Sequence, residues 1–334
     1  MTKENKKGNI FTDNALVKAV GSQKIVVFMA VIVLFIVFSI ASSSFRQYTT
    51  LISLFDMVYY IAFMAIGVTF CLITGGVDLS IGTGMICYSL IGAFLVEKQG
   101  LNVWLGILVC VLCGIAMGLF NGFLVAVLNL PPFIATLCSM MITRGLGSVV
   151  TGGLSVAWPA SGTPGGVYRN LFKINTGSMI IPVGLILIIA AAVIMSIVLN
   201  KTKPGRYIIA VGSNKEALRL SGVNVIKWQW LAYVISGLFT GLASVAYAGV
   251  LSSSVAPGAG AGLEMDAICG AIIGGTSMNG GSGTISGTLL GVFVMALLKL
   301  GLPFIGFQAS GQQITTGLVL ILAVYIDVRK NKKK

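Results

Sequence analysis

Charged side chains are scarce in this sequence, and histidine is missing altogether. Only 9% of the 334 residues are Asp, Glu, Lys or Arg, whereas roughly a quarter are charged in a soluble globular chain. Apolar residues make up 56%, and the mean hydropathy is +0.98. The composition therefore excludes a soluble domain and favours a protein whose solvent is mostly lipid.

Catalytic signatures are also missing. The chain has no GxSxG, HExxH or DFG pattern, and no Gly-Lys dipeptide, which excludes a phosphate-binding P-loop. It cannot hydrolyse nucleotide by itself, and we expect it to bind no metal or cofactor. The lack of histidine and the scarcity of acids also weaken the hypothesis of a proton-coupled carrier, because such proteins rely on embedded acids or a histidine relay.

The six cysteines do not suggest a disulfide framework, because all lie inside apolar segments. Cys110 and Cys113 form a CxxC pair, but no histidine or further cysteine is near them in the sequence. Positive charge is in excess, with 22 basic against 9 acidic residues. The basic residues flank apolar segments and form no single stripe, which argues against nucleic-acid binding.

The apolar segments predict an all-α, polytopic membrane protein. Ten segments approach the ~20 residues that a bilayer requires. They are 25–42, 51–73, 80–96, 103–128, 132–151, 178–199, 228–250, 264–279, 283–300 and 310–327. No AxA-type cleavage site follows the first, which we interpret as an uncleaved span. The predicted transmembrane domain is 25–327, with a polar tail at 1–24, a polar loop at 200–227 and a basic tail at 328–334.

The distribution of charge predicts the orientation. With ten spans and the N-terminus inside, sixteen basic residues lie on the inner side and five on the outer side. This excess agrees with the positive-inside rule for a bacterial plasma-membrane protein. We expect both termini and the 200–227 loop to be cytoplasmic.

An internal repeat is visible without gaps. Ile73–Phe94 matches Ile272–Phe293 at nine of 22 positions, five of them glycine. The two copies follow the second and eighth predicted spans and therefore point the same way across the membrane. This predicts a parallel repeat, one of the arrangements found in transporters.

The first copy contains TGGVDLSIG, Thr74–Gly82, which places Asp78 and Ser80 beside glycines at a membrane boundary. Irregular backbone there is tolerated only where protein buries it or water lines it. A broken helix beside a pathway, with Asp78 and Ser80 capping the next helix, and a plain cytoplasmic turn with Asp78 as N-cap are both compatible with the sequence.

Few other ionisable groups fall within the predicted spans. Asp56 and Arg144 could pair across the bundle, and Glu264 and Asp266 are placed to offset a helix macrodipole. Asn121-Gly122 favours helix packing over substrate contact. Gly283, Gly287 and Gly291, spaced by four, predict a small face for close helix contact.

The polar loop contains signals for a short helix. Ser213 and Glu216 have the spacing of a capping box, and Gly222 suits the left-handed position after a helix end. Pro204-Gly205 is expected to turn the chain before this helix. A helix of about two turns is marginal in water, so we expect it to dock in a groove of a partner or to lie on anionic lipid.

Several long motifs resemble the permease subunits of ribose-type ABC sugar importers. The family patterns are TGGxDLSxG, matched at Thr74–Gly82, and NG followed by PPFIxTL, matched at Asn121-Gly122 and Pro131–Leu137. A TxxGRxxxAxGxNxEAxxLSGxxV loop matches Thr202–Val225, and a YELDAI…GGTS segment matches from Leu263 to Gly291. The usual Tyr-Glu-Leu-Asp is changed here, but Glu264 and Asp266 are kept.

The resemblance implies ten helices per subunit, a second permease subunit (an identical copy or a paralogue), cytoplasmic ATPase subunits that use ATP and Mg²⁺, and an extracytoplasmic sugar-binding protein. It makes the segment from Ser213 to Gly222 the coupling helix seated in the ATPase. The residues expected to couple to the ATPase are Gly205, Arg206, Gly212, Ser213, Asn214, Glu216, Ala217, Leu220, Ser221 and Gly222. Those expected along the translocation pathway are Gly75, Gly76, Asp78, Ser80, Asn121, Glu264, Asp266, Gly274 and Gly275.

The sequence therefore favours the permease of a monosaccharide importer for a ribose-like pentose or a hexose. Another small solute of the same superfamily, such as a nucleoside, an autoinducer or a branched-chain amino acid, is an alternative. An ion-coupled secondary carrier and a non-transporting membrane scaffold or enzyme are weaker hypotheses.

Overall fold

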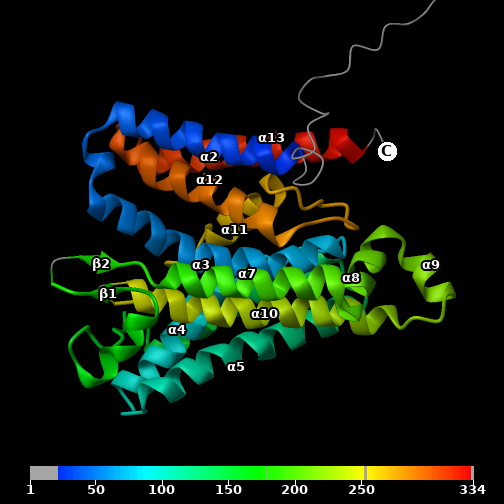
Figure 1. The fold of residues 1–334 in the computed structure, drawn as a ribbon. Coiled ribbons are helices and arrows are strands. Elements are labelled where there is room, and N and C mark those ends of the chain that lie inside the picture. The colour runs from blue at the N-terminus through cyan, green and yellow to red at the C-terminus, as the bar shows by residue number, and fades with distance from the viewer. Residues whose placement is uncertain (1–21, 178, 252–253, 332–334) are drawn as a thin grey trace, which may run out of the picture.

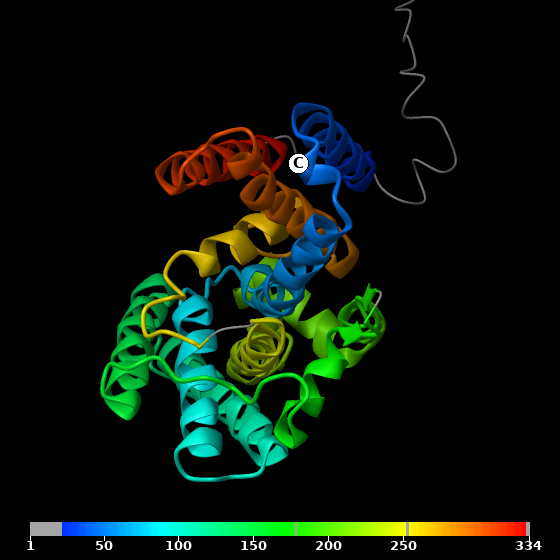
Figure 2. The same cartoon turned by 90° about the vertical axis from the view of Figure 1, so that its left-hand side faces the viewer.

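The protein is a bundle of membrane helices, seen from the side in Figure 1 and along its length in Figure 2. The structure, a computed structural model, describes residues 22–177, 179–251 and 254–331. The long helices are α2 (Ser22–Ala41), α3 (Tyr48–Ile73), α4 (Ile81–Glu97), α5 (Val103–Gly122), α6 (Pro132–Thr151), α7 (Gly184–Lys201), α10 (Val225–Val250), α12 (Ile285–Phe304) and α13 (Ala309–Asn331). The shorter elements are η1 (Ser44–Arg46), η2 (Phe123–Val127), η3 (Pro164–Leu171), α8 (Lys203–Ser213), α9 (Lys215–Leu220), α11 (Leu263–Ile273) and the strand pair β1 (Ile174–Asn175) and β2 (Ile180–Ile181).

Each of the ten predicted segments contains a helix, but not all of these helices are full spans. Among the described residues, eight helices are long and apolar enough to cross a membrane. The other two are α4, with 17 residues, and α11, with 11. At 1.5 Å per residue α11 covers only about half of a ~30 Å bilayer core. The prediction of a full span at 264–279 is therefore wrong.

The ends of the helices follow local signals. At the start of α5 the Asn102 side chain accepts a hydrogen bond from the Trp104 amide at 2.9 Å, as an N-cap does. Pro132 opens α6, where its missing N–H is not needed. Gly152 ends the same helix with a φ of +62°, a conformation that glycine adopts without strain. The predicted polar tail at 1–24 lies almost wholly outside the described residues. At the other end α13 continues to Asn331, so the first residues of the predicted basic tail extend this helix.

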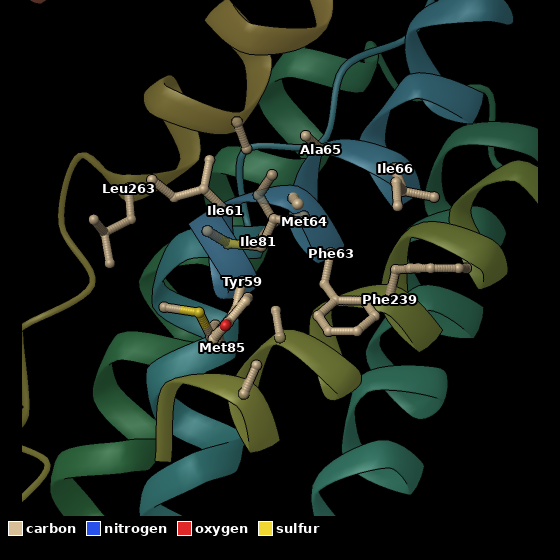
Figure 3. Packing of buried hydrophobic residues seen from close by; sticks show 14 of the residues in the cluster. Tyr59, Ile61, Phe63, Met64, Ala65, Ile66, Ile81, Met85, Phe239 and Leu263 are labelled. Atoms are coloured by element: carbon tan, nitrogen blue, oxygen red, sulfur yellow. The ribbon is translucent and has the colours of Figure 1, made fainter. Parts of the chain in front are cut away.

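The core of the bundle is built around α3 and α10. In the most apolar stretches of these helices, 72% and 67% of the residues are buried, against 11% in α2 and 6% in α13. Phe63 of α3 faces Phe239 of α10, with ring centroids 6.3 Å apart, among the apolar side chains shown in Figure 3. The outer helices α2 and α13 lie together on one side of the bundle (Figure 1) and expose most of their apolar surface.

Glycines allow two helix pairs to approach backbone to backbone. Cβ atoms added at Gly114 of α5 and Gly237 of α10 would lie 2.3 and 2.2 Å from each other's carbonyl oxygens. On α12 a Cβ at Gly291 would lie 1.9 Å from the Gly270 carbonyl oxygen of α11. Gly287 and Gly291 of the predicted small face thus lie on α12 and pack against α11 and its C-cap, as small residues do in membrane bundles, whereas Gly283 precedes α12 and packs against Ile73 of α3.

The two ends of the bundle differ. Helices α8 and α9 project at one end, which we call the α9 end, while η3 and the β1–β2 hairpin cover the opposite end, the η3 end (Figure 1). The segment between α6 and α7 contains η3 and both strands of the hairpin, and its Val156 pairs with Val255.

Candidate functional site

The backbone between α3 and α4 is interrupted at 74–80. Helix α3 ends at Ile73, and Gly75 then takes a φ of +78°. The Gly75 and Gly76 amides donate to the carbonyl oxygens of Leu72 and Cys71, which closes the last turn. The chain returns into the bundle without helical structure until α4 begins at Ile81. The interruption predicted in TGGVDLSIG is confirmed, and we call it the 74–80 break.

Asp78 is the hub of a buried polar cluster within this break. One carboxylate oxygen, Oδ1, accepts hydrogen bonds from the Ser80 amide at 3.1 Å and the Ser80 hydroxyl at 2.6 Å. The other, Oδ2, accepts one from the Ser236 hydroxyl of α10 at 2.8 Å. Only 1% of Asp78 is exposed. These donors satisfy a polar group that would otherwise be costly to bury.

Two further helices join the cluster through Asn121. Its Nδ2 donates to the Ser80 hydroxyl at 2.9 Å, and its Oδ1 accepts from the Ser139 hydroxyl of α6. We define the Asp78 cluster as Asp78, Ser80, Asn121, Ser139 and Ser236. The cluster ties the 74–80 break to α5, α6 and α10.

The Asp78 cluster lies well inside the membrane-crossing part of the bundle. Ser236 is about 16 Å along α10 from its first residue, Val225, at 1.5 Å per residue. Irregular backbone at that depth requires protein partners for its polar groups. Tyr233 supplies a further partner for this backbone, since its hydroxyl donates a hydrogen bond to the Val77 carbonyl at 3.4 Å. The same hydroxyl would lie 2.4 Å from a Cβ at Gly76, so a side chain at Gly76 would displace it.

The structure brings together only some of the predicted pathway residues. Asp78, Ser80 and Asn121 share one cluster, and Gly75 and Gly76 form the helix stop beside it. Sequence reasoning missed Ser139 and Ser236, because single serines in apolar helices are common and give no signal of their own. Ser80 is the N-cap residue of α4, but its side chain forms no capping hydrogen bond, and the Asp78 carboxylate accepts from the Ser80 amide. The preference for helix packing at Asn121-Gly122 agrees with the structure, because Asn121 is buried and its amide forms hydrogen bonds to Ser80 and to Ser139 of α6.

Glu264 and Asp266 lie outside the Asp78 cluster. Glu264 Oε1 accepts a hydrogen bond from the Gly262 amide at 3.2 Å, a capping contact of the predicted kind at the start of α11. Asp266 instead forms an ion pair with Lys299 of α12. Gly274 and Gly275 end α11, where Gly274 packs against the backbone of α12.

Asp56 pairs with a residue other than the predicted one. Its carboxylate lies 3.0 Å from Lys173 Nζ, while Arg144 is exposed on α6. The predicted pairing of Asp56 with Arg144 is therefore wrong. Lys173 follows η3, and its proximity to α3 depends on how the whole segment folds over the bundle.

Side chains from η3 and the residues after it hold the C-terminal end of α10. The Tyr168 hydroxyl donates to the Ala248 carbonyl at 3.0 Å, and Lys173 Nζ to that of Val250 at 3.1 Å. Arg169 donates to the carbonyls of Gly249 and Leu251. Burial raises the pKa of the Tyr168 phenol above its usual value. We call this contact the α10 clamp; it satisfies carbonyls that a helix end leaves open and places cations at the negative pole.

The predicted short helix is present as α9, but it begins one residue later than expected. Asn214 is its N-cap and accepts from the Ala217 amide at 2.9 Å. The predicted capping box is wrong, because Ser213 ends α8 and its hydroxyl donates to the Ile209 carbonyl. Glu216 pairs with Arg219 at 2.8 Å and does not reach back to the cap. Gly222 has a φ of +77° after the helix end, as predicted.

The turn predicted at Pro204-Gly205 is instead the first turn of α8, where proline is tolerated. A Cβ at Gly205 would lie 2.1 Å from the Leu199 carbonyl oxygen, so this glycine allows α7 and α8 to meet closely. No residue of α9 is buried, and Leu220 is 79% exposed. Helix α9 thus presents an apolar side chain and a charged pair on the surface of the α9 end.

Comparisons with known proteins agree on one family. Residues 50–324 match the family described as branched-chain amino acid transport system / permease component. The ribose import permease protein RbsC of Bacillus subtilis is 34% identical over 310 residues, covering 92% of this chain and 94% of that protein. RbsC of Escherichia coli K12 is 34% identical over 313 residues, covering 90% and 92%.

The L-arabinose transport system permease protein AraH of Escherichia coli K12 is 31% identical over 302 residues, covering 90% of this chain and 89% of AraH. No solved structure matches the chain. The match spans nearly all of the helical bundle, including the 74–80 break and α9. The chain therefore belongs to the branched-chain amino acid transport system / permease component family, as a multi-pass membrane subunit that carries out transport and not catalysis.

Proposed function

We propose that this chain is the membrane permease of an ATP-driven importer for a monosaccharide of the ribose or arabinose type. The relatives named for ribose and L-arabinose import match it over about nine tenths of its length. The chain has no P-loop, so the energy must come from a separate ATPase that binds ATP and Mg²⁺. A binding protein on the opposite side would deliver the sugar.

The observation that carries the proposal is the exposed helix α9. It is held by its own caps, one surface ion pair and a hydrogen bond from Lys215 to Gln229 of α10, and none of its residues is buried. A six-residue helix of this kind gains little stability in isolation. Docking in a groove of the ATPase would bury Leu220 and give the helix a function.

The orientation follows from the same assignment. The α9 end would face the cytoplasm, where the excess of basic residues in the loop and at both termini satisfies the positive-inside rule. The η3 end would face outward, towards the binding protein. Two permease subunits, identical or paralogous, would enclose the pathway, with the Asp78 cluster of each positioning its broken span.

We also infer that the chain contains a parallel internal repeat. Helices α3 and α11 both end in a glycine of positive φ, at Gly75 (+78°) and Gly275 (+98°). In each case a second helix, α4 or α12, follows after a non-helical stretch. The ungapped sequence alignment pairs Gly75 with Gly274, whereas the positive φ angles occur at Gly75 and Gly275. The structural correspondence is therefore shifted by one residue from the sequence alignment.

The proposal is tested by co-expressing this chain with a candidate ATPase and a candidate sugar-binding protein from the same organism. Uptake of D-ribose or L-arabinose into proteoliposomes should require ATP on the side of the membrane where the ATPase is bound. It should also require the binding protein on the opposite side. Uptake of a nucleoside or of leucine in place of either sugar would move the substrate assignment within the superfamily. Uptake by this chain alone under an ion gradient would show a secondary carrier.

The role of α9 is tested separately by co-purification of the ATPase. Glu216→Lys and Gly222→Val should leave the permease in the membrane but reduce ATPase recovery at least tenfold. The first replaces the acidic side chain of α9 with a basic one and breaks the ion pair with Arg219, and the second strains the residue after the helix end. Glu97→Lys makes the same charge change at the η3 end and should leave recovery unchanged. Normal recovery with both α9 variants would refute the coupling assignment.

A further inference from the structure

Three backbone segments meet beside the start of α9. They are the end of α3 at Ile73–Gly75, the end of α8 at Gly212–Ser213, and Gly280–Gly281 in the loop between α11 and α12. The Gly281 amide donates a hydrogen bond to the Ile73 carbonyl at 2.8 Å. We call this contact the glycine joint.

The glycine joint leaves no space for side chains. A Cβ at Gly212 would lie 1.8 Å from the Ile73 carbonyl oxygen and 2.5 Å from the Gly281 nitrogen. A Cβ at Gly280 would lie 2.9 Å from the Gly75 nitrogen and 3.0 Å from the Gly212 Cα. Backbone atoms in such contact cannot yield by rotating a side chain, so a displacement of one segment must displace the others.

The joint lies between α9 and the 74–80 break. Gly212 is two residues before Asn214, the N-cap of α9. Ile73 is the last residue of α3, directly before the 74–80 break that contains Asp78. On the α9 side, Lys215 also reaches α10, where its Nζ donates to Gln229 Oε1 at 3.1 Å. That contact joins two flexible side chains, whereas the glycine joint is backbone throughout.

We propose that the glycine joint transmits the movement of α9 to the 74–80 break, with Gly212 as its positioning residue. This rests on the proposed docking of α9 in an ATPase. When the ATPase moves α9, α8 follows, and Gly212 pushes or releases the end of α3 and the Gly280–Gly281 loop. The Asp78 cluster then moves with the break, because Asp78 and Ser80 lie within it.

A purely structural role for the joint predicts a different result. In that case Gly212→Ala would lower stability and reduce ATP hydrolysis and uptake together. A transmitting role predicts that Gly212→Ala affects ATP hydrolysis and uptake differently. The ATPase still binds α9 and hydrolyses ATP, but the 74–80 break does not move and uptake falls. The measured quantity is therefore the amount of sugar moved per ATP hydrolysed.

The experiment uses the complete transporter in proteoliposomes, with D-ribose as the probe. Gly212→Ala should keep ATPase co-purification and hydrolysis within about twofold of wild type and reduce ribose moved per ATP at least tenfold. Gly145→Ala, a helical glycine with open space around it, is the matched control and should change neither. An unchanged ratio of ribose to ATP in Gly212→Ala would overturn the proposal.

Hydrogen exchange gives a second readout that does not depend on the variant folding. In the wild-type complex, a non-hydrolysable ATP analogue should change exchange at the Gly281 amide at least threefold, since its partner is the Ile73 carbonyl. No change there would overturn the proposal even if Gly212→Ala failed to reach the membrane. A wild-type permease that fails to bind any ATPase would instead refute the proposed function itself.

Discussion

A buried carboxyl group needs hydrogen-bond donors, and Asp78 obtains them from its own segment and from distant helices. Ser80 is two residues away, while Asn121 and Ser236 come from α5 and α10. All of these donors are neutral hydroxyl or amide groups. The carboxyl group thus ties the 74–80 break to the bundle, which explains why a polar residue lies so deep among apolar helices.

At the residue scale, Asp78→Ala should lower the free energy of unfolding by about 1–3 kcal/mol, because it leaves Ser80 and Ser236 without their buried partner. Asp78→Asn should lower the free energy of unfolding by less. The amide oxygen still accepts a hydrogen bond, and a serine hydroxyl can rotate to accept one from the amide NH2 group. Thermal unfolding of the purified variants in detergent measures both.

A double-mutant cycle with Ser236→Ala checks the assignment to this contact. The coupling between Asp78→Ala and Ser236→Ala should reach at least about 0.5 kcal/mol, as is typical of residues in one hydrogen-bond network. Simple additivity of the two losses would show that Asp78 does not act through Ser236.

Among the elements, α10 connects the two ends of the molecule. Its first turn follows α9 directly, its middle contributes Ser236 to the Asp78 cluster, and the α10 clamp holds its end. The clamp residues come from the segment between α6 and α7, which lies outside the ten predicted spans. Their role depends on helix carbonyls that lie about 80 residues further along the chain.

At the element scale, Arg169→Gln should destabilise the η3 end by about 1–3 kcal/mol, because the buried Gly249 carbonyl and the half-buried Leu251 carbonyl lose their charged donor. The expected signs are a lower unfolding temperature and faster proteolysis within 152–183. Arg144→Gln removes an exposed arginine from α6 and serves as the control. Equal effects from the two variants would contradict the clamp.

The whole molecule is polarised, with a charged α9 end and a loop-covered η3 end. We predict that cysteines introduced one at a time at Val167 of η3 and Leu220 of α9 lie on opposite sides of the membrane, in a chain whose two incompletely buried cysteines, Cys113 and Cys138, are replaced by serine. A membrane-impermeant maleimide should label position 167 in intact cells and position 220 only after permeabilisation. Labelling of 220 in intact cells would invert the proposed orientation.

The sequence by itself determined the features that depend on local composition. Apolar runs located ten helices because a helix in lipid satisfies its own backbone, whatever its neighbours are. Local signals likewise predicted the stop at Gly222 and the irregular backbone around Asp78. The position of α8 was missed, since Pro204 and Gly205 suggest a turn as readily as the first turn of a helix.

Only the tertiary structure decided which distant groups meet. Ser236 is 158 residues from Asp78, and Lys173 is 117 residues from Asp56. No local pattern encodes these pairs, because they depend on how α3 and α10 pack and on how the η3 segment crosses the end of the bundle. The same holds for Gly212, whose spacing is ordinary but whose contact with Ile73 and Gly281 exists only in the folded chain.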